Sequence, residues 1–458
     1  MPDSCRPYAV ALAAAWLMLA GPSASAQDAP ATETKPSGAT LAIATWGGAY
    51  GQSQEIAYFQ PFTQKTGVKI ETETYDGTLA AIKDKIGASS SPFDIVDLSQ
   101  GVLDALCRDG LLEQIDSSTL TSGSGGQSVS DDFLSGGIAP CGIASVAWSM
   151  AIAFDRQAFT KAQPGKIADL LDVQRFPGKR ALPNGPRYTL ELALLADGVD
   201  PADIYTQLGT PEGVDRAFKA LDKIKAHILW WDKAEDAISM LMQRKAAIAA
   251  GYSGRIFRAA VGARQRIDVL WDGQVYDLDL WAIPKAAANK DEAKRFIAFA
   301  TEPAQMAAQA ALIAYGPMRK SAIALVGKNP SIDIDMKAYL PTAPDNFRKA
   351  LRFDEAWWNE HGGELAARFQ TWREQPVVTD AKAATPDGKP SAADGKSKAT
   401  DAKPSPANGK SKPEDAKAAT ADEKPKPADA KPSTPEAQTG SVPYAAPKPA
   451  PNTAPNRR

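Results

Sequence analysis

Histidine is scarce in this chain of 458 residues, which contains only His227 and His361. Two histidines disfavour a histidine-dependent metal site and a Ser-His-Asp catalytic triad, although they exclude neither. The sequence also has no P-loop, no H-E-x-x-H motif and no nucleophile elbow. Asp94 and Asp97 frame a predicted strand, but no further metal ligands are evident near them. We therefore expect a protein that is not an enzyme and that uses neither a metal nor a cofactor.

An excess of charge of one sign is absent as well. The chain has 52 Lys and Arg residues against 54 Asp and Glu residues. A nucleic-acid-binding protein normally carries a basic stripe, and none stands out in the part of the sequence expected to fold. We therefore expect no nucleic-acid partner.

Long apolar segments are absent except at the N-terminus. There, Arg6 precedes an apolar stretch at residues 8–20, which is too short to span a bilayer comfortably. Residues 24–26, Ala-Ser-Ala, then fit the pattern of a cleavage site, so we predict a signal peptide at residues 1–26 that is cleaved near Ala26. A retained membrane anchor is the less favoured alternative. Since no other stretch approaches the roughly 20 apolar residues of a transmembrane helix, we expect the mature protein to be soluble and exported.

Cysteine is rare, and export changes what the few cysteines imply. Of the three in the sequence, Cys5 lies in the predicted signal peptide, which leaves Cys107 and Cys141. Two cysteines in an oxidising compartment are a candidate disulfide. It would close a loop of roughly 35 residues and stabilise the fold by about 3–4 kcal/mol in the chain-entropy model. Two buried free thiols are the alternative, because the sequence does not give the distance between the two residues.

Aromatic residues almost disappear after about Gln375, where Ala, Lys, Pro, Asp, Ser and Thr dominate and only Tyr444 remains. The tripeptide Asp-Ala-Lys recurs there at irregular spacing, which does not indicate a solenoid. Such a segment cannot bury enough apolar surface to offset the chain entropy lost on folding. We predict a disordered tail at residues 375–458 and a shorter linker of similar type at residues 27–39.

Strand and helix patterns alternate between these two segments. Strands are expected at residues 41–45, 68–76, 93–99, 143–155, 226–231, 246–252, 267–273 and 276–284. Helices are expected at residues 52–65, 78–87, 101–110, 190–198, 214–225 and 234–245. Helices of roughly 10–15 residues between strands imply a mostly parallel sheet with helices on both faces, an α/β fold.

The helix at residues 52–65 is expected to place Ile56, Phe59 and Phe62 on one side, and Gly67 is expected to end it.

The order of these segments predicts two lobes. The long apolar strand at residues 143–155 is expected to carry the chain from one lobe to the other, and the strands after residue 266 to return it. We predict one lobe from residues 40–146 and 279–318 and a second from residues 147–278 and 319–374, with C-terminal helices packing across. This order creates a cleft between the lobes, a common location for a small-molecule site.

The sequence resembles the substrate-binding proteins of ABC importers, in the spermidine/putrescine-binding group of extracellular solute-binding protein family 1. Stretches from about Leu41 to Trp372 carry the resemblance: TWGGAYGQ, PFTQKTGVKI, FDIVDLS, CRDGLLE, FPGKRALPNGPRYTLELALLADGVDPADIY, LWDGQVYDLDLWAIPK, EAKRFIAFATEP and YGPMRK. The resemblance implies a periplasmic-binding-protein type II fold, in which two α/β lobes joined by a hinge close on a ligand. It also implies a monomeric periplasmic receptor that delivers a polyamine-type ligand to a permease in the inner membrane.

The resemblance also suggests ligand-binding residues. The family holds polyamines with aromatic rings and acidic groups, because cations gain about 0.5–2 kcal/mol over an aromatic face and form charge-assisted hydrogen bonds with carboxylates. The positions that match are Trp46, Tyr50, Ser99, Tyr252 and Asp279. For each, a packing or structural role is the alternative.

Three further pairs of residues are expected to have structural roles. Asp277 and Trp281 flank Asp279 and are expected to alternate to the opposite face of the strand. The tryptophan pairs at residues 230–231 and 357–358 are expected to pack in the core or between lobes.

The stretch NGPRYTLE departs from the family pattern. Where the polyamine binders carry acidic residues, this sequence has Gly185 and Tyr188, while Arg187 is kept. Asn184 could cap the following helix, and Pro186 fits a first helical turn. A helix N-terminus with an arginine favours an anionic group, so we take Arg187 and Tyr188 as candidate ligand residues. Arg187 paired with a structural carboxylate is the alternative, and an amino acid-like or carboxylate-bearing ligand is an alternative to a polyamine. A secreted hydrolase on the same fold is much less favoured.

Overall fold

The computed structural model describes residues 38–376 except residues 88 and 263–265. The predicted signal peptide, nearly all of the predicted linker and nearly all of the predicted tail lie outside the described residues. Within the described ranges, no helix is long and apolar enough to cross a membrane. The chain forms two compact units. Unit 1 contains the chain up to Ser145 together with Asp279–Gln309, and unit 2 contains Val146–Leu278 together with the chain from Ala310 onward.

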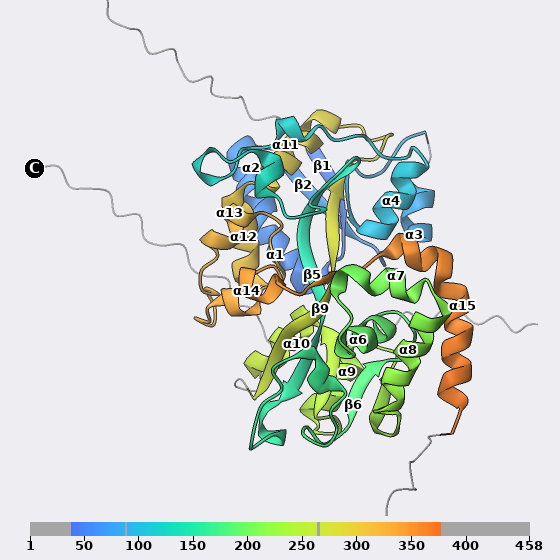
Figure 1. Cartoon of the computed structure of the whole chain (residues 1–458). Helices are drawn as coiled ribbons and strands as arrows, with labels where there is room; N and C mark the ends of the chain where they lie inside the picture. Colours follow the sequence, from blue (N-terminus) through green and yellow to red (C-terminus); the bar gives the residue numbers. More distant parts are fainter. Residues whose placement is uncertain (1–37, 88, 263–265, 377–458) are drawn as a thin grey trace, which may run out of the picture. The chain divides into compact units, whose positions relative to one another are not determined.

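Unit 1 is built on strands β1 (Thr40–Thr45), β2 (Lys69–Thr74), β3 (Ile95–Ser99) and the last residues of β9 (Ile267–Ala282). Their order is β2-β1-β3-β9. β1 pairs in parallel with β2 and β3, whereas β9 runs antiparallel to β3. The sheet is therefore mixed, with parallel pairs among β1, β2 and β3 and one antiparallel pair between β3 and β9. The helices are α1 (Gly48–Gln54), α2 (Gln60–Thr66), α3 (Leu79–Ile86), α4 (Gln100–Arg108), α5 (Val129–Asp132), α11 (Lys290–Ala300) and the first part of α12 (Pro303–Leu312) (Figure 1).

The helix predicted at residues 52–65 is present, but it contains an irregularity that the sequence did not reveal. A π-helical segment, Glu55–Phe59, separates α1 from α2, and Gly67 ends α2 in the left-handed conformation as expected. A π turn inserts a residue and shifts the faces of a helix. As a result, Phe59 and Phe62 are buried but Ile56 is exposed, so the expectation that all three share one buried side was wrong for Ile56.

Unit 2 contains strands β6 (Arg180–Pro183), β7 (Ile228–Trp231), β8 (Ile248–Tyr252) and β10 (Leu351–Arg352), together with most of β5 (Gly142–Asp155) and most of β9. The order β5-β8-β6-β7 includes an antiparallel β5–β8 pair and parallel β8–β6 and β6–β7 pairs. β10 adds to β9 in parallel. The helices are α6 (Thr189–Ala196), α7 (Ile204–Leu208), α8 (Pro211–Asp222), α9 (Ala234–Met242), α10 (Ser253–Gly262), α13 (Lys320–Leu325), α14 (Pro344–Phe347) and α15 (Glu355–Glu374).

The long helix α15 is held to unit 2 by aromatic packing. Trp372 packs on Phe218 of α8, with ring centroids 5.4 Å apart, and Phe369 packs edge-on against Trp230 at 5.3 Å. Trp231 and Trp358 are buried in the same core. The expectation that the two tryptophan pairs pack in the core is confirmed for these residues.

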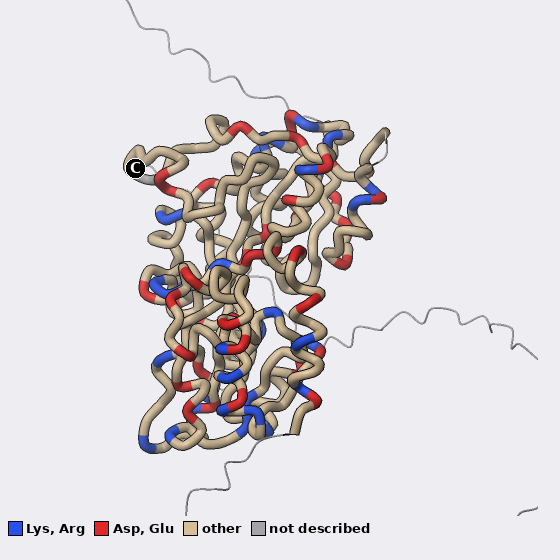
Figure 2. The backbone as a smooth tube through the Cα atoms, turned by 45° about the vertical axis from the view of Figure 1, so that its right-hand side comes forward, with Lys and Arg blue, Asp and Glu red and all other residues tan. Residues whose placement is uncertain are grey.

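Charges of both signs occur along the chain in each unit (Figure 2).

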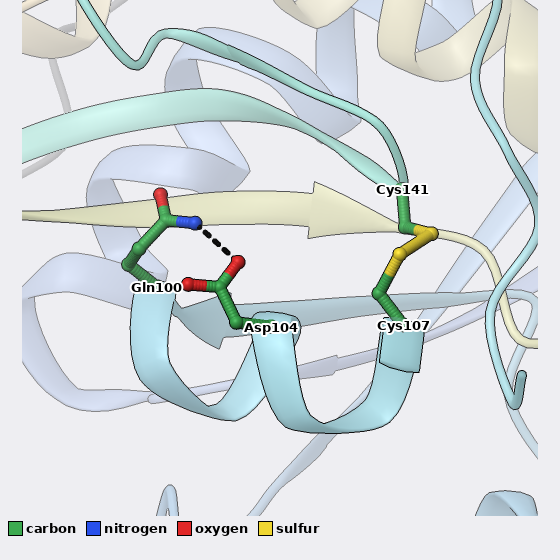
Figure 3. The surroundings of a disulfide bond; sticks show 4 residues. All are labelled: Gln100, Asp104, Cys107 and Cys141. Carbon is green, nitrogen blue, oxygen red and sulfur yellow. Dashed lines mark hydrogen bonds between the residues drawn. A yellow bond between two sulfur atoms is a disulfide. The ribbon is translucent and has the colours of Figure 1, made fainter. Parts of the chain in front are cut away.

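The predicted disulfide is confirmed. Cys107 lies at the end of α4 and Cys141 just before β5, with their Cα atoms 5.9 Å apart (Figure 3). On the same helix, Gln100 donates a hydrogen bond to Asp104 at 2.8 Å. The disulfide bond therefore ties α4 to the loop that leads into β5.

Candidate functional site

The stretch TWGGAYGQ forms a turn from β1 into α1. Gly47 and Gly48 have φ values of 68° and 59°, a left-handed region that favours glycine. A Cβ atom on Gly47 would lie 2.1 Å from Thr74 Cγ2. The turn therefore requires glycine for its backbone, and it places Trp46 directly after the strand.

Trp46 is half-buried and packs on Tyr75, with ring centroids 5.6 Å apart and planes tilted by 37°. Gly77 makes room for the indole, because a Cβ atom there would lie 1.9 Å from the ring. The indole N–H is buried and forms no hydrogen bond of normal geometry among the described residues, but it is near enough to Asp97 to help lower the pKa of that carboxyl group. Trp46 thus combines a fixed ring with a donor close to a buried acid.

Tyr50, a candidate ligand residue, lies inside unit 1. Its side chain is 7 % exposed, and its hydroxyl donates to Asp97 Oδ2 at 2.8 Å. Ser145 Oγ lies 3.3 Å from the same hydroxyl and donates to the backbone carbonyl of Asp279 at 2.9 Å. Tyr50 therefore supports the residues around it through a buried polar network.

Asp97 is a buried acid whose role the sequence did not indicate. It is completely buried in β3, where its Oδ2 also accepts a hydrogen bond from Gln54 Nε2 at 2.7 Å. Its Oδ1 has no hydrogen-bond partner among the described residues. Burial raises the pKa of Asp97 to about 7, although the hydrogen bonds from Tyr50 and Gln54 oppose this shift. The available signal was one acidic residue inside the apolar strand Ile95–Ser99.

Ser99 and Asp279 are brought together directly. They are opposite each other in the antiparallel pairing of β3 and β9. Ser99 is half-buried and Asp279 is 7 % exposed. Residues two apart in a strand lie on the same face, so the expectation that Asp277 and Trp281 alternate away from Asp279 was wrong. Trp281 instead shows that this strand is covered by the unit 1 core, since it packs edge-on against Tyr58 and Phe296.

In unit 2, Tyr188 and Tyr252 form an aromatic cluster. Tyr188 stacks on Phe353 with ring centroids 4.5 Å apart, and it meets Tyr252 edge-on at 6.5 Å. Trp148 of β5 meets Tyr252 edge-on at 5.4 Å. Burial raises the pKa of both tyrosines, so they remain neutral donors and acceptors near neutral pH.

The start of α6 differs from its expected form. Tyr188 is the N-cap, at φ 64°, and makes no side-chain capping bond. Asn184 does not cap the helix, because its amide donates to Asp232 at 2.8 Å and its carbonyl accepts from Arg373. The helix begins at Thr189, beyond Pro186, so the expected roles of Asn184 and Pro186 were both wrong. The left-handed backbone at Tyr188 leads directly into the helix, which begins one residue before the predicted range of 190–198.

Arg187 is exposed and pairs with Glu355, the first residue of α15. Its guanidinium also lies 5.5 Å from the ring centroid of Phe353 and 5.8 Å from that of Trp358. A carboxylate partner, the alternative that the sequence left open, is therefore present. Since a guanidinium has five donors, the pair with Glu355 leaves donors for a further anion.

Glu191 is a second buried acid that sequence reasoning missed. It lies in α6 with no exposed surface, and its Oε1 accepts hydrogen bonds from Trp358 Nε1 at 2.5 Å and from Tyr205 at 3.3 Å. Burial raises the pKa of Glu191 to about 7. Glu191 therefore fixes Trp358, which in turn packs against Arg187.

The burial of Glu191 predicts a pH dependence of stability. The folded protein keeps this proton up to about pH 7, whereas the unfolded chain loses it near pH 4.5. Stability contributed at this site therefore falls as the pH rises from about 4.5 to about 7. Glu191→Gln should remove this loss and raise the free energy of unfolding above pH 7 by up to about 3 kcal/mol. Urea unfolding of both proteins at acidic and at mildly alkaline pH would measure this difference in the free energy of unfolding. Glu364→Gln, at an exposed position in α15, is the matched control. If Glu191→Gln had the same free energy of unfolding as the wild type at alkaline pH, the prediction would be contradicted.

No group of three or more His, Cys, Asp and Glu side chains that could hold a metal ion is found in the part of the chain that the structure describes.

Comparison with known proteins shows the class of this chain. A model of the bacterial extracellular solute-binding protein family matches residues 57–342. The chain belongs to this family, and the two α/β units agree with the periplasmic-binding-protein fold of its relatives. It is a solute-binding receptor of the kind that serves ABC transporters. This membership supports the expectation that the protein carries a solute and is not an enzyme.

Three particular relatives are informative. A gamma-aminobutyric acid (GABA)-binding protein of Pseudomonas aeruginosa is 37% identical over 333 residues, covering 73% of this chain and 90% of the relative. The solved structure of a GABA receptor is 26% identical, with a TM-score of 0.59, and covers 74% of this chain and 99% of that one. A binding protein of Agrobacterium tumefaciens R10 in complex with agropinic acid is 29% identical, with a TM-score of 0.55 and the same coverage.

The spermidine/putrescine-binding resemblance is more distant. The periplasmic protein of this name from Escherichia coli is 24% identical, covering 53% of this chain and 68% of the relative. The resemblance stated from the sequence therefore identifies the broader class, whereas the relatives that match at higher identity are named for other ligands.

Proposed function

We propose that this protein is the periplasmic receptor of an ABC importer, that it captures a small zwitterionic amino acid of the GABA type, and that it passes this ligand to a permease in the inner membrane. The observation that carries the proposal is Arg187. It is an exposed guanidinium beside the aromatic rings of Phe353 and Trp358. A planar guanidinium binds a carboxylate through two parallel hydrogen bonds.

Unit 1 supplies groups for the opposite charge. We assign the ammonium end of the ligand to Trp46, Ser99 and Asp279. Ser99 and Asp279 are paired across β3 and β9, and Trp46 follows the neighbouring strand β1. An ammonium group gains attraction from an aromatic face and from a carboxylate together. Tyr188 and Tyr252 would line the apolar part of the ligand.

A plain polyamine fits these groups less well. Its second ammonium group would meet Arg187, and like charges at a binding site oppose binding. The distant spermidine/putrescine-binding relatives keep this ligand class as the alternative.

Isothermal titration calorimetry tests the proposal. GABA should bind at least about 10-fold more tightly than putrescine or spermidine, since each buried charge pair contributes on the order of 1–3 kcal/mol. Butyrate and butylamine are the matched controls, because each keeps one charged end of GABA, and both should bind weakly. Tight binding of a polyamine together with no heat from GABA would reject the amino acid ligand in favour of the polyamine.

A further inference from the structure

A buried polar network in unit 1 converges on Asp97. Its carboxylate accepts hydrogen bonds from Tyr50 at 2.8 Å and Gln54 at 2.7 Å. Its backbone carbonyl accepts a third hydrogen bond, from the hydroxyl of Tyr75 at 2.7 Å. Tyr75 in turn packs on Trp46. One residue of β3 thus holds both Tyr50 and the aromatic partner of Trp46.

The electrostatic surroundings of Asp97 are unusual for a carboxylate with no exposed surface. Buried charges normally have a partner of opposite sign, yet no ion pair to Asp97 is found among the described residues. Asp97 contributes to the raised pKa values of Tyr50, Tyr58 and Tyr75, and Asp279 acts on Tyr50 and Tyr75 in the same direction.

We propose that Asp97 is a positioning residue for the cationic end of the ligand: it fixes Tyr50 and the Tyr75–Trp46 pair by hydrogen bonds, and its charge attracts an ammonium group at Trp46 without touching it. This inference rests on the proposed function, because it requires a ligand with an ammonium group. It goes beyond the assignment of Trp46, Ser99 and Asp279, since Asp97 is buried and makes no ligand contact.

The protonation of Asp97 then controls affinity. Burial raises the pKa of Asp97 to about 7, so the side chain is mostly neutral at pH 6 and mostly anionic at pH 8. The pKa values of Tyr50, Tyr58 and Tyr75 are raised by burial, so these phenols stay neutral over this range. The exposed Asp76 has a lowered pKa, owing to its hydrogen bonds with Thr78, and stays charged. An ammonium and a carboxylate on the ligand keep their charges as well.

A cationic group favours the anionic form of Asp97, so binding should strengthen as the pH rises and should release a proton near pH 7.

The test is calorimetric titration of GABA into the wild-type protein and the Asp97→Asn variant at about pH 6 and about pH 8. Wild-type affinity should rise about 10-fold between these values, as expected for one charge acting at short range. Asp97→Asn keeps the side-chain shape and the backbone carbonyl that holds Tyr75. It should show no such rise and should bind about 10-fold more weakly than the wild type at pH 8.

Two further measurements keep the test decisive if Asp97→Asn folds poorly. Wild-type titrations near pH 7 in two buffers of different ionisation enthalpy should show net proton release. Tyr50→Phe removes a hydrogen bond that lowers the pKa of Asp97, so it should move the midpoint of the affinity profile to higher pH.

The outcomes separate the two proposals. GABA binding with no proton release and with the same affinity at both pH values would overturn the role of Asp97 and leave the proposed function standing. Absence of heat with every amine and amino acid, from a folded protein, would overturn both.

Discussion

Replacement of Arg187 by alanine should lower the affinity for GABA about 100-fold, or roughly 3 kcal/mol, because charge-assisted hydrogen bonds to a carboxylate would be lost. Arg187→Lys should recover little of this affinity, since an ammonium cannot form the two parallel hydrogen bonds of a guanidinium. Titration calorimetry on folded variants measures both effects.

Two controls separate a loss of ligand contact from damage to unit 2. Arg187→Ala also leaves Glu355 without its partner, so Glu355→Gln is the matched variant. It keeps the size of the side chain and frees the guanidinium, and it should bind GABA as tightly as the wild type or more tightly. Butylamine has no carboxylate, so its weak binding should not respond to Arg187→Ala. If GABA affinity fell equally in Glu355→Gln, the ion pair and not the free guanidinium would be what the ligand requires.

Loss of the Cys107–Cys141 disulfide should lower the free energy of unfolding by about 3–4 kcal/mol, given the loop of 34 residues that it closes. The Cys107→Ser/Cys141→Ser double variant avoids an unpaired thiol, and urea unfolding under non-reducing conditions measures the change. Reduction of the wild-type protein should reproduce the stability of the double variant. GABA affinity should remain unchanged at temperatures where both forms are folded, because the bond ties α4 to the start of β5 and touches none of the proposed ligand residues. Equal unfolding midpoints for oxidised and reduced protein would contradict the prediction.

Regular elements of this fold could be predicted because their signals are local. Apolar runs give β1, β3 and β5, and helical spacing followed by Gly67 gives α2 and its end. The cysteine pair could be predicted because only two candidates remain in the exported chain. Each of these inferences depends on a pattern within a short stretch of sequence or on a count.

The N-cap of α6 and the π segment could not be predicted in the same way. The sequence Asn-Gly-Pro around residues 184–186 contains the residues of a helix start, but the N-cap is Tyr188 in a left-handed conformation, and the helix begins at Thr189, within one residue of the predicted range. That conformation is stabilised by packing of Tyr188 on Phe353, which lies far away in the sequence. Tertiary contacts decided the outcome at this position.

The candidate site divides along the same line. Family resemblance selects Trp46, Ser99 and Asp279, and the pairing of β3 with β9 brings the last two together. The burial of Asp97 and Glu191 could not be predicted, because an isolated acid in a strand or helix gives no sign of burial. Their importance depends on partners such as Tyr50 and Trp358, which come from other elements.

The route of the chain through β5 and β9 has a consequence for the order of synthesis. The residues of β9 that pair with β3 begin at Asp279, so they are made after Val146–Leu278 of unit 2. Domains that are continuous in sequence can fold as they emerge from the ribosome, N-terminal domain first. Unit 1 cannot, because β3 has no neighbour on that side until β9 has been translated. Cys107 and Cys141 both lie in the earlier segment, so after export their covalent loop can close before β9 has paired with β3.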